Sequence, residues 1–351
     1  MRIQIVGPIF PDSFARNIAA AAEQMGHTVL VARKRLAHRW LNQYWIRALN
    51  IIRDLRPVER RSHSNLVRQA ENFHPDLVLV TNGLLPPEVV ARLRSATGAK
   101  VAFWYCDPVA NLGRQYPLGS QFDAWFFKEP YMAVTFRAKM GINAHYLPEA
   151  CNPLWHHRVE LTESDRSRYG CDLTTAGNLY YYKATILETF ANYDMKIWGV
   201  GYAHWLGSSL RNCWPCVFVA ELEKAKAFNA ARIVLNPMNY AEIEGVNCRL
   251  FEAAGCGAFQ ITDWKPSLPQ SFEPEREIVT FHTLQELKEK VDYYLARPQE
   301  RLEIADRAYV RAHREHTYEK RLEKMFEILG LGSVSHRSPS ELVANEVKTD
   351  R

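Results

Sequence analysis

The sequence predicts an α/β protein of two domains, each organised around a parallel sheet. The chain has 351 residues, 47% of them hydrophobic, which is enough to bury two cores of ordinary size. It opens with an apolar run at Arg2–Val6, an alanine-rich helical stretch at Ser13–Met25 and a second apolar run at Thr28–Ala32. A strand–helix–strand unit of this kind places its strands in parallel. A second alternation of strands and helices begins at Asp172.

Further apolar runs continue the first sheet, and each ends in polar or glycine-bearing residues. Ligands of open α/β sheets bind at the carboxyl ends of the strands, so any chemistry is expected at these ends. Asp107, in the segment WYCDP, stands out among them. The loop after the first strand, GPIFPDSFARN, lacks the GxGxxG fingerprint, which argues against a dinucleotide cofactor. The further runs are Asp76–Thr81, Lys100–Tyr105, Ala124–Phe127 and His145–Leu147.

Composition changes along the chain predict the domain boundaries. We expect a first domain at residues 1–150, a linker at 151–170, a second domain at 171–331 and a flexible tail at 332–351. The linker is polar, contains proline and has no clean period. Predicted strands of the second domain include Lys196–Val200, Ile233–Asn236 and Ile278–Phe281. Its predicted helices include Tyr180–Tyr193, Val219–Ala231, Leu284–Ala296, Arg301–His313 and Tyr318–Leu329.

Charge and cysteine content limit the classes of function. The net charge of +5 is compatible with anionic small molecules but weaker than a dedicated nucleic-acid binder usually carries. The seven cysteines are scattered and odd in number, which indicates a reducing compartment. No run approaches the roughly 18 apolar residues of a membrane span, and the N-terminus leads straight into a strand. We therefore expect a cytoplasmic protein with no nucleic-acid partner.

Residues 33–68 form the most basic stretch of the chain. They hold ten lysine or arginine residues against Asp54 and Glu59, interleaved with aromatic side chains such as Trp40 and Trp45. A basic helix with aromatic residues indicates peripheral contact with an anionic membrane surface, or with a charged acceptor. The alternative is a helix whose apolar face packs on the sheet while its arginines face solvent.

The second half is organised around Ala241–Asp263, which reads AEIEGVNCRLFEAAGCGAFQITD. It predicts a short helix bracketed by Glu244 and Glu252, ended by glycine and followed by an apolar strand. Eight residues of helix would separate the two carboxylates by roughly 12 Å, about the distance from the sugar ring to the ribose of a nucleoside diphosphate sugar. The N–H groups near Val246 and Asn247 would then face the pyrophosphate. The alternative is an ordinary helix with two surface glutamates.

At these residues the chain resembles the nucleotide-sugar-dependent glycosyltransferases of the two-domain GT-B type. Their motif is a glutamate, seven residues, a second glutamate and a helix end of small residues and glycine, here Glu244 to Glu252 followed by AAGCG. The form VNCRLFEAAGCGAFQITD, with Asn247 and Arg249, is most similar to the CgeB-like group. The resemblance implies two Rossmann-like domains facing each other across a cleft, with a C-terminal helix crossing back. It also implies a metal-independent transferase whose donor is a nucleoside diphosphate sugar, without a further cofactor.

The resemblance assigns donor-binding roles to several residues. The Gly177-Asn178 turn ends the first strand of the second domain and leads to Lys183. Lys183 would bind the donor phosphates, with Arg249 as a second cation. Glu252 would accept the two ribose hydroxyls, because a carboxylate can accept two hydrogen bonds from a diol.

Catalysis needs stabilisation of the leaving group and, in an inverting enzyme, a general base near the acceptor. Glu244 would contact hydroxyls of the transferred hexosyl or related sugar. Asp107 matches the position where CgeB-like proteins carry an acidic residue followed by proline, so it is our candidate base. In a retaining enzyme it would only orient the acceptor, and without function it would be a turn or cap residue. The acceptor would be a glycan, a lipid-linked group or a protein, in polysaccharide biosynthesis.

Three other functions stay open on the sequence. The first is a catalytically silent GT-B-like protein that binds nucleotide sugars during surface-layer assembly. The second is a thiol oxidoreductase that uses Cys213 and Cys216 of the CWPC segment. The third is a nucleotide-sugar epimerase. We expect no metal site, because no DxD pair is evident and the paired histidines lack further ligands.

Overall fold

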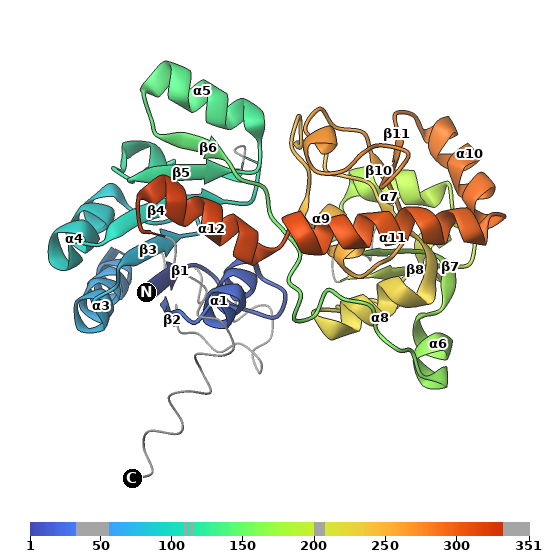
Figure 1. Cartoon of the computed structure of the whole chain (residues 1–351), viewed down its shortest axis with the longest axis horizontal. Helices are drawn as coiled ribbons and strands as arrows, with labels where there is room; N and C mark the ends of the chain where they lie inside the picture. The colour runs from blue at the N-terminus through green and yellow to red at the C-terminus, as the bar shows by residue number, and fades with distance from the viewer. Residues whose placement is uncertain (33–55, 109–110, 113–114, 200–207, 333–351) are drawn as a thin grey trace, which may run out of the picture.

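Two parallel sheets, one from each half of the chain, form the architecture (Figure 1). The computed structural model describes residues 1–32, 56–108, 111–112, 115–199 and 208–332. The first sheet has six strands in the order β2-β1-β3-β4-β5-β6, and the second has five in the order β11-β10-β9-β7-β8. Every strand pairing in them is parallel. The predicted α/β fold with two Rossmann-like sheets is confirmed.

The strands of the first sheet are apolar on both faces, because helices cover parallel sheets on both sides. All residues of β3 and β5 are buried. Ser13 caps the first helix by accepting a hydrogen bond from the N–H of Arg16. The strands are β1 (Arg2–Val6), β2 (Thr28–Ala32), β3 (Leu77–Val80), β4 (Lys100–Tyr105), β5 (Ala124–Phe127) and β6 (Ala144–Tyr146). The helices are α1 (Phe14–Gln24), α3 (Arg56–Phe73), α4 (Pro87–Thr97) and α5 (Pro130–Met140).

The second half repeats this arrangement around a central strand, β9, whose last four residues are all buried. Its other strands are β7 (Cys171–Ala176), β8 (Met195–Trp198), β10 (Gln260–Asp263) and β11 (Val279–Phe281), and β9 itself is Ala231–Asn236. Its helices are α6 (Glu163–Tyr169), α7 (Tyr181–Glu188), α8 (Leu222–Ala230), α9 (Cys248–Gly255), α10 (Leu284–Leu295), α11 (Pro298–Glu315) and α12 (Tyr318–Leu329).

Two predicted elements differ from those observed. The segment predicted as a linker contains α6, because Thr162 and Asp165 form a reciprocal capping box that supports a seven-residue helix. The helix predicted at Tyr180–Tyr193 ends at Glu188, where the chain turns and Phe190 enters the core. Most of the basic stretch and most of the predicted tail lie outside the described residues. Within those described, no helix is both long enough and apolar enough to cross a membrane.

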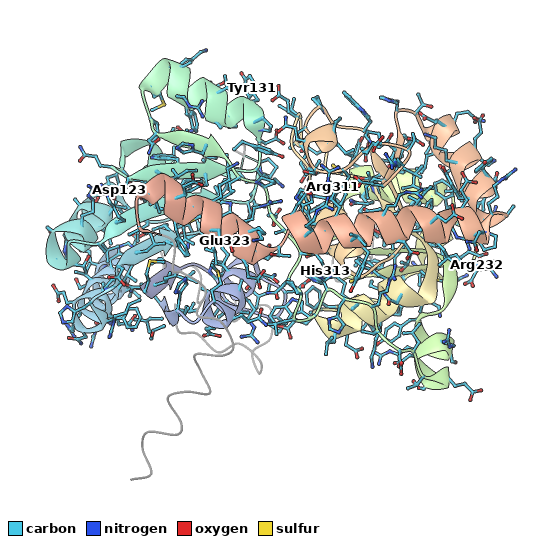
Figure 2. All side chains as sticks on the ribbon, in the orientation of Figure 1. Asp123, Tyr131, Arg232, Arg311, His313 and Glu323 are labelled. Atoms are coloured by element: carbon cyan, nitrogen blue, oxygen red, sulfur yellow. The ribbon has the colours of Figure 1, made fainter. Side chains whose placement is uncertain are left out.

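The last helix, α12, crosses from the second half back onto the first sheet, as the resemblance implies. Figure 1 shows α11 along the second half and α12 along the first, and Figure 2 labels His313 on α11 and Glu323 on α12. Leu322, Met325 and Phe326 of α12 are buried in one core with residues of β1, β3 and β4. Because α12 completes this core, the stability of the first half depends on the C-terminal end of the chain.

Truncation of Leu322 to alanine should therefore lower the free energy of unfolding by about 2–5 kcal/mol. The side chain is fully buried, whereas Leu302 of α11 is 58% exposed and serves as the matched control. Leu302→Ala should change the stability by less than about 0.5 kcal/mol. Denaturant unfolding of both variants tests this expectation. Equal effects of the two truncations would show that α12 does not contribute to the core.

Candidate functional site

The helix of the central stretch is shorter than predicted. α9 starts at Cys248, and its N-cap is Asn247, whose side chain accepts a hydrogen bond from the N–H of Leu250 at 3.1 Å. Glu244 therefore lies in the loop before the helix, while Glu252 lies within the helix. The helix start predicted near Val246 is therefore wrong, and fewer than eight helical residues lie between the two glutamates, so the separation of about 12 Å assumed a longer helix than the structure has. Asn247 moves the helix start because asparagine satisfies a free N–H group there.

Two cations meet beside the start of α9. Burial lowers the pKa of Lys183 well below its usual value, and the nearby guanidinium of Arg249 lowers it further. Lys183 Nζ donates to the carbonyl oxygen of Ala176 at 3.2 Å, and Arg249 Nη1 donates to Asn236 Oδ1 at 3.1 Å. In the described part of the chain, no carboxylate lies within 4.0 Å of either cation. The predicted pair thus comes together with positive charge that no carboxylate balances.

Gly177 allows Arg249 to approach the turn after β7. Its φ is +99°, and an added Cβ would lie 2.4 Å from Arg249 Nη2. Asn178 is exposed, and its side chain donates to the hydroxyl of Tyr180 at 3.3 Å. The turn therefore lies against one of the two predicted cations, while the side chain of Asn178 binds a neighbouring tyrosine.

Glu252 belongs to a buried chain of charges that joins the two halves. Lys224 of α8 donates to Glu252 Oε2 at 2.9 Å and also binds Oδ2 of Asp12, in the loop after β1. Burial alone would lower the pKa of Lys224, but the two carboxylates outweigh it and raise that pKa. The motif around α9 predicted a role for Glu252, whereas no motif pointed to Lys224 or Asp12. The one available signal was that Asp12 lies in the first loop at a strand end.

Asp12, His156 and Glu252 bring three potential metal ligands within 4.8 Å of one another. Two observations argue against a metal ion there. Nδ1 of His156 accepts a hydrogen bond from the N–H of Asn152 at 2.9 Å. The ring proton is therefore on Nε2, which lies 3.8 Å from Asp12 Oδ1, so Nε2 has no lone pair to offer a metal ion. The ammonium of Lys224 already binds both carboxylates. Lys224 is therefore the cation of this cluster.

A second connection joins the end of β5 to the loop before α9. Lys128 Nζ lies 2.7 Å from Glu242 Oε1, and both side chains are only 5% exposed. The next residue, Glu129, accepts hydrogen bonds of 2.9 to 3.1 Å from the consecutive backbone N–H groups of residues 243–245. Carboxyl ends of strands from both sheets thus meet at one site.

Glu149, shortly after β6, is a buried carboxyl at this site. Burial raises its pKa to about 8; the charge of Lys128 opposes the increase, while Glu252 and Asp107 add to it. At neutral pH its carboxyl is therefore mostly protonated and can donate a proton. The sequence analysis recognised a strand end here without selecting Glu149. Only its burial among other carboxylates distinguishes it.

The two predicted catalytic carboxylates lie in loops of opposite halves. Asp107 is exposed after β4 and is close enough to Glu149 to raise its pKa. Glu244 is half-buried, and its carbonyl oxygen accepts a hydrogen bond from the N–H of Ser267 at 3.0 Å. Among the residues with described positions, neither carboxylate takes part in an ion pair. Both carboxylates are therefore available to a ligand.

The CWPC segment does not have the environment of a redox site. A reactive thiol of this type needs a lowered pKa at the start of a helix. Burial instead raises the pKa of Cys213, while Cys216 is an exposed free thiol. The segment ends a turn and opens no helix. The structure thus removes the basis of the thiol oxidoreductase hypothesis.

Comparisons with known proteins agree with this geometry. The family described as glycosyl transferase-like matches residues 183–327, which include α9 and the strands on either side of it. Spore protein CgeB of Bacillus subtilis (strain 168) is 23% identical over 257 residues, which cover 68% of this chain and 78% of that protein. Sucrose-phosphate synthase from Thermosynechococcus elongatus shares the fold with a TM-score of 0.67 at 11% identity, over 94% of this chain and 98% of that chain. The chain therefore resembles CgeB-like proteins and has the GT-B glycosyltransferase fold.

A second solved structure extends the likeness over both halves of the CgeB-like chain. Anabaena HepE, in complex with UDP and glucose, has a TM-score of 0.66 at 13% identity and covers 95% of this chain and 100% of that chain. The predicted GT-B arrangement is therefore confirmed for the CgeB-like protein. At these identities the structural likeness shows the fold alone.

The raised pKa of Glu149 predicts a pH dependence of stability. The folded chain keeps a proton up to pH about 8 that the unfolded chain loses near the ordinary carboxyl value of 4.5. The free energy of unfolding should therefore fall as the pH rises between these values, by up to about 1.4 kcal/mol per pH unit from this group. Glu149→Gln should remove this contribution. Denaturant unfolding at several pH values measures it.

The control is Glu160→Gln, at an exposed carboxyl in the same connecting segment. It should keep the pH dependence of the wild-type chain. If Glu149→Gln also kept that dependence unchanged, the raised pKa would not belong to Glu149.

Proposed function

We propose that this CgeB-like chain transfers a sugar from a nucleoside diphosphate sugar to an acceptor hydroxyl. The observation that carries the proposal is that Lys183 and Arg249 meet beside the start of α9 with no carboxylate partner among the described residues, so that a bound anion would favour the charged form of both. A diphosphate would balance two adjacent cations and accept hydrogen bonds from N–H groups at a helix start. The complex of HepE with UDP and glucose supports this class of donor.

Backbone donors at the same place support a diphosphate ligand. The N–H groups of Cys248 and Arg249 belong to the first turn of α9, so they have no partner within the helix. No residue of the described ranges accepts a hydrogen bond from the N–H of Val246 or Asn247. The backbone of residues 246–249 can therefore donate to phosphate oxygens.

We assign the ribose to Glu252 and the transferred sugar to Glu244. Lys224 binds one oxygen of Glu252, Oε2, so Oε1 is the oxygen left for a ribose hydroxyl. A diol would need two acceptor oxygens, so Glu252 offers one oxygen fewer than predicted from the sequence. Glu244 stands in the loop just before the proposed phosphate site, where a hydroxyl of the sugar would reach its carboxylate.

On the acceptor side, we assign Asp107 as the general base of an inverting reaction or as the group that orients the acceptor in a retaining one. Lys183 and Arg249 would stabilise the leaving diphosphate, because fixed positive charge favours the charge that develops there. In this proposal the chain's own cations supply that role without a metal ion, and the donor is the only small molecule required.

We further propose that residues 1–150 bind the acceptor, a glycan, a lipid-linked group or a protein, and that residues 171–331 bind the donor. The reaction would take place in the cytoplasm. The basic stretch at 33–68 would hold the chain at the inner face of the membrane, since basic and aromatic side chains favour anionic lipid. Of this stretch, the structure describes only the part that starts α3.

Donor binding gives a direct test through Lys183→Met and Arg249→Gln. A nucleoside diphosphate sugar from a panel of UDP, GDP and TDP sugars should raise the melting temperature of the wild-type chain. Each variant should bind that donor at least about ten-fold more weakly, a loss of about 1.4 kcal/mol. Lys183→Met should also raise the stability of the free protein, because it removes a buried cation without a carboxylate partner.

Lys288→Met, at an exposed lysine of α10, is the matched control and should leave donor binding unchanged. A wild-type chain that no nucleotide sugar of the panel stabilises would refute the proposed function. Binding without transfer or hydrolysis in any acceptor extract would instead favour the catalytically silent protein.

A further inference from the structure

We propose that Glu129 is a positioning residue that fastens the sugar-contact loop, residues 242–245, to the first sheet. This inference rests on the proposed function, because the loop is named for the contact assigned to Glu244. Glu129 belongs to the opposite half of the protein, directly after Lys128 at the end of β5. Nothing in the sequence motif around α9 points to it.

The contact is made by one carboxylate and three consecutive backbone donors. Glu129 Oε1 accepts from the N–H of Ile243 at 3.1 Å, and Oε2 accepts from those of Glu244 and Gly245 at 3.0 and 2.9 Å. Hydrogen bonds to an ionised group are about twice as strong as neutral ones. Together the three bonds fix the backbone of residues 243–245.

The position of Glu129 in its own helix makes this contact unusual. It is the N-cap residue of α5, where a carboxylate would ordinarily accept from the first turn of that helix. Its side chain makes no such capping bond. The carboxylate instead accepts hydrogen bonds from the loop of the opposite half, so it does not stabilise its own helix.

Two neighbouring features fit the same contact. Lys128 and Glu242 form a buried ion pair at 2.7 Å, one residue before Glu129 and at the first residue of the loop. Gly245 has no side chain at the point of closest approach, where an added Cβ would lie 2.3 Å from the carbonyl oxygen of Lys128 and 3.0 Å from the Glu129 carboxyl carbon. The loop and the end of β5 are therefore complementary in charge and in shape.

The N–H groups of this region are divided between two partners. Glu129 accepts hydrogen bonds from the N–H groups of residues 243–245. The N–H groups of residues 246–249 have no acceptor in the part of the chain described. The loop is thus held from the first half while its next N–H groups stay free for the donor. The same carboxylate thus contacts the second half and holds the backbone of Glu244.

The test compares Glu129→Gln with the wild-type chain in two measurements. The first is hydrogen exchange of the amides of residues 243–245, which needs no ligand. A glutamine has one acceptor oxygen and no charge, so these amides should exchange at least ten-fold faster in the variant. Glu88→Gln, at an exposed glutamate of α4, is the control and should exchange as the wild type does. Unchanged exchange in Glu129→Gln would overturn the proposal.

The second measurement separates the sugar from the nucleotide. In Glu129→Gln the Kd of the free nucleoside diphosphate should stay within two-fold, while KM for the sugar donor rises and kcat falls, each by ten-fold or more. Glu129→Asp, which is one methylene shorter, should not restore either value. Equal weakening of nucleotide and sugar donor would assign Glu129 a general structural role and refute positioning. If the wild-type chain binds no nucleotide at all, the proposed function fails, while the exchange measurement still decides whether Glu129 fastens the loop.

Discussion

Buried charge between the two halves is the constraint on which the arrangement of this protein depends. Lys128 with Glu242, and Lys224 with Glu252 and Asp12, form ion pairs that are almost wholly shielded from solvent. A buried ion that loses its partner costs several kcal/mol. Separation of the halves would therefore require each of these groups to regain water. The pairs thus decide which strand ends face each other, and that choice creates the site.

Charge balance differs within this site, and the proposed donor site lies where carboxylate partners are lacking among the described residues. The acidic groups Asp12, Glu242 and Glu252 have cationic partners from other elements. Among the described residues, Lys183 and Arg249 have only carbonyl or amide oxygens as partners, and Arg249 disfavours the charge of Lys183. A ligand that supplied negative charge would lower the cost of keeping both groups charged. The start of α9 adds backbone donors at the same place.

Four glutamates of the site show how strongly the environment decides the role of one residue type. Glu252 is paired with a lysine, and Glu129 binds backbone N–H groups. Glu149 is buried with a pKa of about 8, so it is mostly protonated at neutral pH. Glu244 is half-buried, and its backbone N–H and carbonyl groups form hydrogen bonds with Glu129 and Ser267. Only the first and the last of these were selected from the sequence, because only they belong to a recognisable spacing.

The sequence by itself determined the α/β class and the strands of both sheets, and the resemblance to GT-B glycosyltransferases selected Gly177, Lys183 and Arg249. The class and the strands follow from hydrophobic periodicity, which is a local property. The residue spacing predicted a helix start near Val246, whereas the N-cap at Asn247 places it at Cys248. The partners of Glu252 and the contacts of Glu129 could not be read from the chain. Lys128 and Glu242 are 114 residues apart, and only the packing of one sheet against the other brings such distant charges together.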